Sequence, residues 1–148
     1  PAATSTIEDM ATGSFQEVLD DNSADANQVE TLVLCSGKFY YEMKEKAQNM
    51  GIDSYAFVRI EQLYPLPEKQ IEAILKKYKN AKNVLWAQEE PANMGAWTYM
   101  AMNLRYIPLI GVCRPASAAS AEGSKKLHEK RLEKLYSQLF SYAKVPVK

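Results

Sequence analysis

Residues 31–38 have the sequence TLVLCSGK, and this stretch decides the fold that the sequence predicts. Its first five residues form an apolar run that ends at Ser36 and Gly37. Such a run is typical of a strand that is buried on both faces of a sheet. A helix is expected directly after it, over residues 38–50, because apolar side chains recur there at helical spacing and Gly51 then ends the segment.

The same alternation continues along the chain. Apolar runs that end in turn residues alternate with segments whose apolar side chains recur at helical spacing. Strands joined by crossover helices pair in parallel, and the helices then cover both faces of the sheet. The sequence therefore predicts the α/β class, with a mostly parallel sheet covered by helices on both faces. The expected strands are residues 31–35, 55–60, 83–88 and 109–113, and the expected helices are residues 38–50, 68–78, 94–105 and 124–143.

Charge divides the chain near residue 30. Residues 1–30 hold seven of the 18 acidic residues and no lysine or arginine, so all 18 basic residues lie further along. The sequence predicts an acidic leader or linker at residues 1–29 and the α/β domain at residues 30–148. The leader is either a solvated, flexible tail or a segment attracted to the basic body. A short patch within it, residues 15–20, is suited to docking on another surface.

Several protein classes are disfavoured by what the sequence lacks. No apolar run is long enough for a transmembrane helix, and the start has neither the basic nor the apolar region of a signal peptide. The start also lacks methionine, which is consistent with a fragment of a longer chain or with processing. The motifs GxSxG, GxGxxG and GxxxxGK[ST] and the usual metal-binding spacings are missing. The sequence therefore predicts neither a catalytic residue nor a metal ligand.

The cysteines and the single histidine also offer no reactive setting. Cys35 and Cys113 each lie inside an apolar, strand-like run, which indicates buried thiols. A disulfide remains open, because adjacent strands would bring them close. His128 is expected on the surface of a basic helix, whose aromatic residues lie on its apolar stripe. That helix is interpreted as a solvated face, and no nucleic-acid partner is expected.

Two polar stretches that follow strands are candidate anion-binding sites. Ser36 and Lys38 follow the first strand, and Arg114 and Ser117 follow the fourth. Ligands of open α/β sheets bind at the carboxyl ends of strands, and backbone N–H groups at a helix start attract anions. A phosphate or carboxylate would fit these residues. The alternative is structural: a Ser-Gly turn at the first site, and a plain loop before a serine-capped helix at the second.

Four further residues are assigned structural or interface roles. Arg59 lies within a strand, where a buried guanidinium needs a partner. Glu89 and Glu90 end the next strand along the chain, so a bidentate pair with Arg59 is predicted. Paired carboxylates acting as acid and base are the minor alternative. Trp97 follows Gly95 and is suited equally to core packing and to an interface.

Several blocks together resemble one known family. They occur in that family's order and spacing from about residue 31 to 140, and the stretch around residues 15–21 resembles what precedes them. On these residues the chain resembles the C-terminal domain of the E1 component of 2-oxoglutarate dehydrogenase. Each block alone is weak, and the set is highly specific. The blocks are residues 34–41, 58–67, 88–97 and 114–117, together with Gly123, Ser124 and His128.

This resemblance carries several implications. The fold would be of the transketolase C-terminal-domain type, typically with one antiparallel strand. The parent enzyme would decarboxylate 2-oxoglutarate with thiamine diphosphate and Mg²⁺ and pass a succinyl group to the lipoyl arm of E2 within the citric acid cycle. Cofactor residues and catalytic histidines would lie upstream, and no Gly-Asp-Gly motif occurs here. The enzyme would be a dimer in the bacterial cytoplasm, or in the mitochondrial matrix of a eukaryote.

The chain also departs from the family. The connection between Trp97 and Arg114 is shorter than in many relatives. The regulator-binding branch often has two adjacent arginines where this chain has Cys113 and Arg114, which puts regulation by acetyl-CoA in doubt.

Three functional hypotheses follow. The first is a structural and interaction domain, inactive as an isolated fragment, that contacts other E1 domains and a second E1 subunit. The second is a regulatory domain that binds an acyl-CoA or nucleotide. The third, a freestanding small enzyme, has no supporting residues. The equivalent domain of a 2-oxoadipate dehydrogenase E1 is a close alternative, because the substrate pocket would lie upstream.

Overall fold

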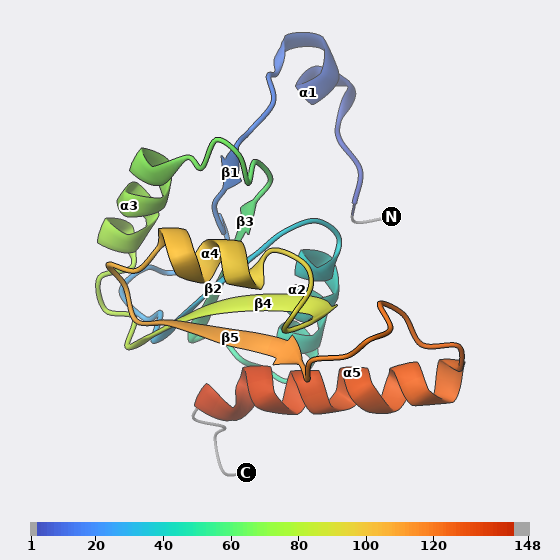
Figure 1. Ribbon diagram of the computed structural model, residues 1–148. Helices are drawn as coiled ribbons and strands as arrows, with labels where there is room; N and C mark the ends of the chain where they lie inside the picture. Colours follow the sequence, from blue (N-terminus) through green and yellow to red (C-terminus); the bar gives the residue numbers. More distant parts are fainter. Residues whose placement is uncertain (1–2, 144–148) are drawn as a thin grey trace.

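A five-stranded sheet forms the centre of the structure, a computed structural model that describes residues 3–143 (Figure 1). Its strand order is β1-β3-β2-β4-β5. The last four strands in sequence pair in parallel, and β1 pairs antiparallel with β3. The mostly parallel α/β sheet expected from the sequence is therefore confirmed. The strands are β1 (Val18–Leu19), β2 (Thr31–Cys35), β3 (Tyr55–Ile60), β4 (Asn83–Pro91) and β5 (Leu109–Arg114).

Helices cover both faces of this sheet, as predicted. One apolar cluster joins one face to α3 and α4, and a second cluster joins the opposite face to α2 and α5. The helices are α1 (Ile7–Thr12), α2 (Phe39–Asn49), α3 (Glu68–Lys77), α4 (Trp97–Asn103) and α5 (Lys125–Leu139), with a 3-10 turn at Phe140–Tyr142. Over the described residues, none of these helices has the length and apolarity needed to cross a bilayer.

The predicted elements are found. The helix predicted over residues 124–143 ends at Leu139 and is followed by a 3-10 turn, and two other boundaries also differ. β4 continues through Glu89 and Glu90 to Pro91, which pairs with Arg114 of β5. Helix α4 is shorter than the predicted helix over residues 94–105, because the chain before it forms a turn in which Gly95 has φ 65°. The two boundaries have one cause: the extended end of β4 needs a turn before α4 can start.

The second half of the predicted acidic leader contacts the domain. Asp21 is 2% exposed, and its carboxylate accepts hydrogen bonds from the backbone N–H of Phe57 at 3.1 Å and from Lys44 Nζ at 2.8 Å. Asp20 forms an ion pair with Lys77. The attraction between leader and basic body that the sequence left open is present at these residues. Helix α1, in contrast, has no buried residue and projects away from the sheet (Figure 1).

The two cysteines lie on different strands and are both free thiols. Cys35 is in β2 and Cys113 is in β5, and β4 lies between those strands. The disulfide that the sequence left open is therefore not formed.

Candidate functional site

The carboxyl ends of the parallel strands form the candidate functional site. β2 lies between β3 and β4, so the connections after β2 and β3 leave toward opposite sides of the sheet. Ligands of open α/β sheets bind at such a reversal point. Lys38 follows β2, and Arg59, Glu89 and Arg114 lie at the ends of β3, β4 and β5. The fold thus brings most of the predicted polar residues to one edge.

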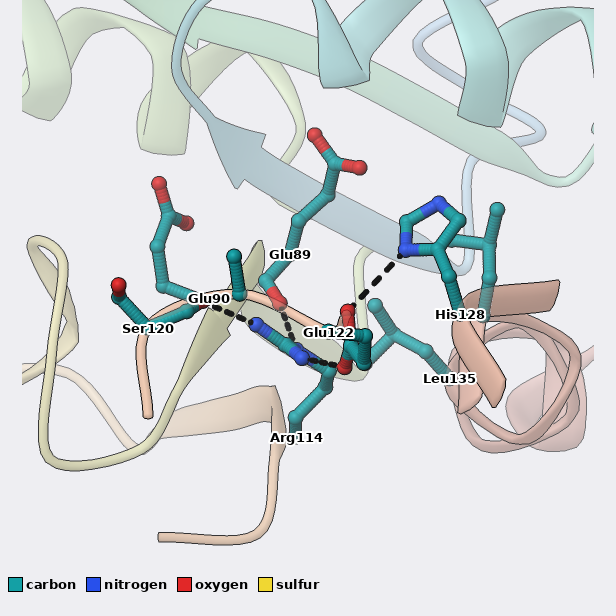
Figure 2. Close-up of a pocket in the computed structure, with 9 residues that line it drawn as sticks. Glu89, Glu90, Arg114, Ser120, Glu122, His128 and Leu135 are labelled. Atoms are coloured by element: carbon teal, nitrogen blue, oxygen red, sulfur yellow. Dashed lines mark hydrogen bonds and ion pairs between the residues drawn. The ribbon is translucent and has the colours of Figure 1, made fainter. Parts of the chain in front are cut away.

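Arg114 is the centre of a buried polar cluster at this edge (Figure 2). Its Nη2 donates a hydrogen bond to the carbonyl oxygen of Ser120 at 3.0 Å, and its Nε donates to the carbonyl oxygen of Glu89. Its guanidinium also forms an ion pair with Glu122, whose side chain is 4% exposed. The loop after β5 is therefore fastened to the end of β4 through one arginine.

Glu122 contacts two further side chains, both from α5. Its carboxylate lies 3.0 Å from Arg131 Nη1. It also lies 3.3 Å from His128 Nδ1 (Figure 2). A buried carboxylate is costly unless it is paired, and these contacts supply the pairing. Glu122 therefore ties the loop after β5 to both the sheet and the long helix. No motif in the sequence points to Glu122, although it is the one acidic residue in residues 115–124.

This arrangement leaves Arg114 engaged by groups of its own chain. Beside it is a cavity of about 290 Å³ that Glu89, Glu90 and Glu122 also line. Carboxylates oppose the entry of an anion, so an anion at Arg114 would have to displace Glu122. The anion-binding assignment of Arg114 stays a prediction. Ser117, the other residue of that assignment, instead exchanges two hydrogen bonds of 3.0 Å with the Asn93 side chain.

Lys38 and Ser36 lie on the other side of β4. Lys38 forms an ion pair with Glu42 of α2, and its Nζ lies 4.0 Å from Glu89 Oε2. Burial raises the pKa of Glu89, and the charge of Lys38 opposes this shift. Ser36 lines a separate cavity of about 350 Å³ together with Glu90. The pairing of Lys38 and Ser36 at one anion site stays a prediction.

The predicted pair of Arg59 with Glu89 and Glu90 is wrong. Arg59 Nη1 donates a hydrogen bond to Tyr41 Oη at 2.9 Å, and its Nε lies 3.7 Å from Glu61. The physical reason is the strand order: β2 lies between β3 and β4, so these two strands are not neighbours in the sheet although they follow one another in the sequence. The need for a partner was predicted correctly, but the partner was not.

Trp97 and Gln88 together fix the turn before α4. Gln88 is 5% exposed, and its Oε1 accepts hydrogen bonds from Trp86 Nε1 at 2.9 Å and from the backbone N–H of Trp97 at 2.8 Å. Its Nε2 donates to the Met94 carbonyl oxygen at 2.7 Å. The Trp97 ring then packs against Gly111 of β5. Trp97 thus has a packing role. The sequence feature that could have identified Gln88 is a polar residue in an otherwise apolar strand.

The described residues offer little for covalent chemistry. Burial raises the pKa of the Cys35 thiol, and burial followed by the charge of Glu90 raises that of Cys113 to about 12, so both stay protonated near neutral pH. His128 is exposed and contacts Glu122. Residues 3–143 contain no group of three or more histidine, cysteine, aspartate or glutamate side chains placed to hold a metal ion.

Comparison with known proteins gives one consistent result. The family model described as 2-oxoglutarate dehydrogenase C-terminal matches residues 4–140. The chain is 43% identical over 149 residues to the 2-oxoglutarate dehydrogenase E1 component of Azotobacter vinelandii, covering 95% of this chain and 16% of that protein. It is 40% identical over 141 residues to the 2-oxoadipate dehydrogenase complex component E1 of Xenopus laevis, covering 91% of this chain and 15% of that protein. The chain thus spans about a sixth of the length of these relatives.

Proposed function

The chain belongs to the 2-oxoglutarate dehydrogenase C-terminal family, and from this premise we propose that it is a structural and interaction domain of an E1 subunit. Its role is to pack against other domains of E1 and against a second E1 subunit. One observation carries the proposal: the cations Lys38, Arg59 and Arg114 at the carboxyl edge of the sheet are each paired within the chain. Because these cations are paired internally, we expect them to hold the loops at this edge in place rather than to bind a ligand.

For the intact protein we propose the oxidative decarboxylation of 2-oxoglutarate and transfer of the succinyl group to lipoyl-bearing E2. Thiamine diphosphate would supply the electron sink for decarboxylation, Mg²⁺ would bind its diphosphate, and residues outside this chain would hold both. The relatives named for 2-oxoadipate dehydrogenase support the same role with 2-oxoadipate as the substrate. The proposed location is the bacterial cytoplasm, with the mitochondrial matrix as the eukaryotic counterpart.

The test uses an antibody against this chain to isolate the native protein that contains it. The precipitate is assayed for reduction of an artificial electron acceptor with 2-oxoglutarate or with 2-oxoadipate, in the presence of thiamine diphosphate and Mg²⁺. Activity that depends on one 2-oxo acid supports the proposal and identifies the substrate. An inactive precipitate that contains only a polypeptide of this size contradicts it.

A regulatory function would require an acyl-CoA or nucleotide to use Ser36, Lys38, Arg114 and Ser117. The acidic surroundings of Arg114 do not favour this function, which therefore remains the second hypothesis. Saturable binding of acetyl-CoA or AMP to the intact protein, lost on Arg114→Ala substitution, would establish it.

A further inference from the structure

The outer edge of β5 is open for another strand. β5 is the last strand in the order β1-β3-β2-β4-β5, so β4 is its only partner among the described residues. An edge strand presents alternate backbone N–H and C=O groups to a possible partner. Ile110, near its centre, is 36% exposed. Figure 1 shows β5 along the rim of the sheet, with α4 on one side and α5 on the other.

A groove of about 410 Å³ follows this edge and includes both sides of it. Gly111 and Cys113 of β5 form its floor, Trp97 forms one wall, and Arg131, Lys134 and Gln138 of α5 belong to the other. Side chains of a strand alternate between the two faces of a sheet. A groove that includes both faces of an edge strand therefore has the shape that an added strand would occupy.

The charge of the groove indicates which side chains an added strand would carry. Arg131, Lys134 and Arg114 line it, and none of its described lining residues is acidic. Arg131 and Arg114 are already paired with Glu122, but Lys134 is exposed on the α5 side. The cationic wall is therefore suited to carboxylate side chains.

The opposite wall is apolar and rigid. A Cβ atom at Gly111 would lie 2.6 Å from the Trp97 ring, so the ring lies directly on the strand backbone. The backbone N–H of Trp97 is also bonded to the buried Gln88. An indole held in this way offers a fixed surface to an apolar or aromatic side chain.

We propose that the free edge of β5 binds an extended acidic segment of a partner polypeptide as an additional strand. The backbone of the segment pairs with β5, its acidic side chains point toward Lys134 and Arg131, and the alternate apolar side chains pack toward Trp97. This interaction is strand addition, in which main-chain hydrogen bonds supply affinity and the side-chain pockets supply specificity. The proposed binding at β5 goes beyond the proposed E1 role and does not depend on which 2-oxo acid is the substrate.

The test measures binding of labelled peptides to the intact protein by fluorescence anisotropy. The probe is a capped seven-residue peptide in which glutamate alternates with valine and phenylalanine. Its control has the same sequence with alternate backbone nitrogens methylated, which removes hydrogen-bond donors and leaves the charge unchanged. The probe is expected to bind at least about tenfold more tightly than the methylated peptide.

Charge reversal separates specific binding from general attraction. Lys134→Glu is expected to weaken binding of the glutamate peptide about tenfold and to strengthen binding of the matching lysine peptide. Lys126→Glu, an equal change on α5 outside the groove, should leave both affinities within about twofold of the original protein. The gain for the lysine peptide also shows that the variant is folded.

Three outcomes overturn the proposal. Equal binding of the plain and methylated peptides would mean that the groove attracts anions without strand addition. Equal effects of Lys134→Glu and Lys126→Glu would mean that the net charge of α5 alone is responsible. No binding to the intact protein would mean that another part of the protein, or a second copy, occupies the edge.

Discussion

Single residues within this domain show how burial raises the cost of a polar group. Burial by itself would raise the pKa of Asp21, but hydrogen bonds from Lys44, the N–H of Phe57 and Ser23 outweigh it, so the pKa lies below its ordinary value. The sequence placed Asp21 in a polar linker, because a carboxylate is normally solvated. Two of these partners, Lys44 and Phe57, lie far away in the chain, and the buried position of Asp21 is favourable because the fold brings them to it.

Asp21→Asn is expected to lower the free energy of unfolding at pH 7 by about 3 kcal/mol, since it leaves Lys44 without its buried partner. The depressed pKa means that this contribution is present above the unfolded pKa of about 3.9 and is lost as the pH falls through the folded value. Urea unfolding at several pH values measures both effects. Asp53→Asn, at an exposed carboxylate, is the control; equal losses in the two variants would contradict the role of Asp21.

Gly111→Ala is expected to destabilise the domain by about 2 kcal/mol, because the new Cβ would lie 2.6 Å from the Trp97 ring in a packed region. Gly123→Ala is the matched control, since its Cβ would meet nothing within 4 Å. Thermal unfolding of both variants gives the comparison. A Gly111→Ala protein as stable as the control would show that Trp97 moves aside without cost.

At the scale of elements, the loop between β5 and α5 depends on tertiary contacts. Residues 115–124 are rich in alanine and serine, and their sequence suggests no fixed conformation. Their position comes from Glu122, which pairs with Arg114 of the sheet and Arg131 of the helix. Sequence spacing predicted the elements on either side, but nothing local specifies the path between them.

Glu122→Gln is therefore expected to release this loop and to lower the free energy of unfolding by about 3 kcal/mol, because the buried charge of Arg114 would lose its carboxylate partner. Limited proteolysis should cut within residues 115–124 faster than in the original protein. Glu129→Gln is the control, since that side chain is 62% exposed and pairs with Lys125 at the helix surface. Unchanged cleavage in Glu122→Gln would show that other contacts hold the loop.

At the scale of the whole molecule, the sheet joins segments that are distant in the chain. β1 pairs with β3 through Val18 and Leu19, although 35 residues separate the end of β1 at Leu19 from the start of β3 at Tyr55. Asp20 adds a hydrogen bond of 2.8 Å from Tyr78 Oη. The acidic leader is thus joined to the domain from about residue 17, and the predicted division at residue 29 stays a prediction to be tested.

Two truncations test that division. A chain that begins at residue 16 is expected to keep its free energy of unfolding within about 0.5 kcal/mol, because α1 has no buried residue. A chain that begins at residue 30 lacks Asp21 and β1. Its free energy of unfolding is expected to fall by about 3 kcal/mol or more. Urea unfolding distinguishes the two. Equal stability of both chains would support a separate leader that ends at residue 29.

The sequence by itself determined the class of fold, the principal strands and helices, and the family. Apolar periodicity depends only on neighbouring residues, and the blocks around Ser36, Glu89 and Arg114 are continuous in the chain. Only the tertiary structure decided which of these residues meet: Arg59 with Tyr41, Arg114 with Glu122, and Asp21 with Lys44. The reason is physical, since a buried charge takes whichever partner the strand order brings within reach, and local sequence does not encode strand order.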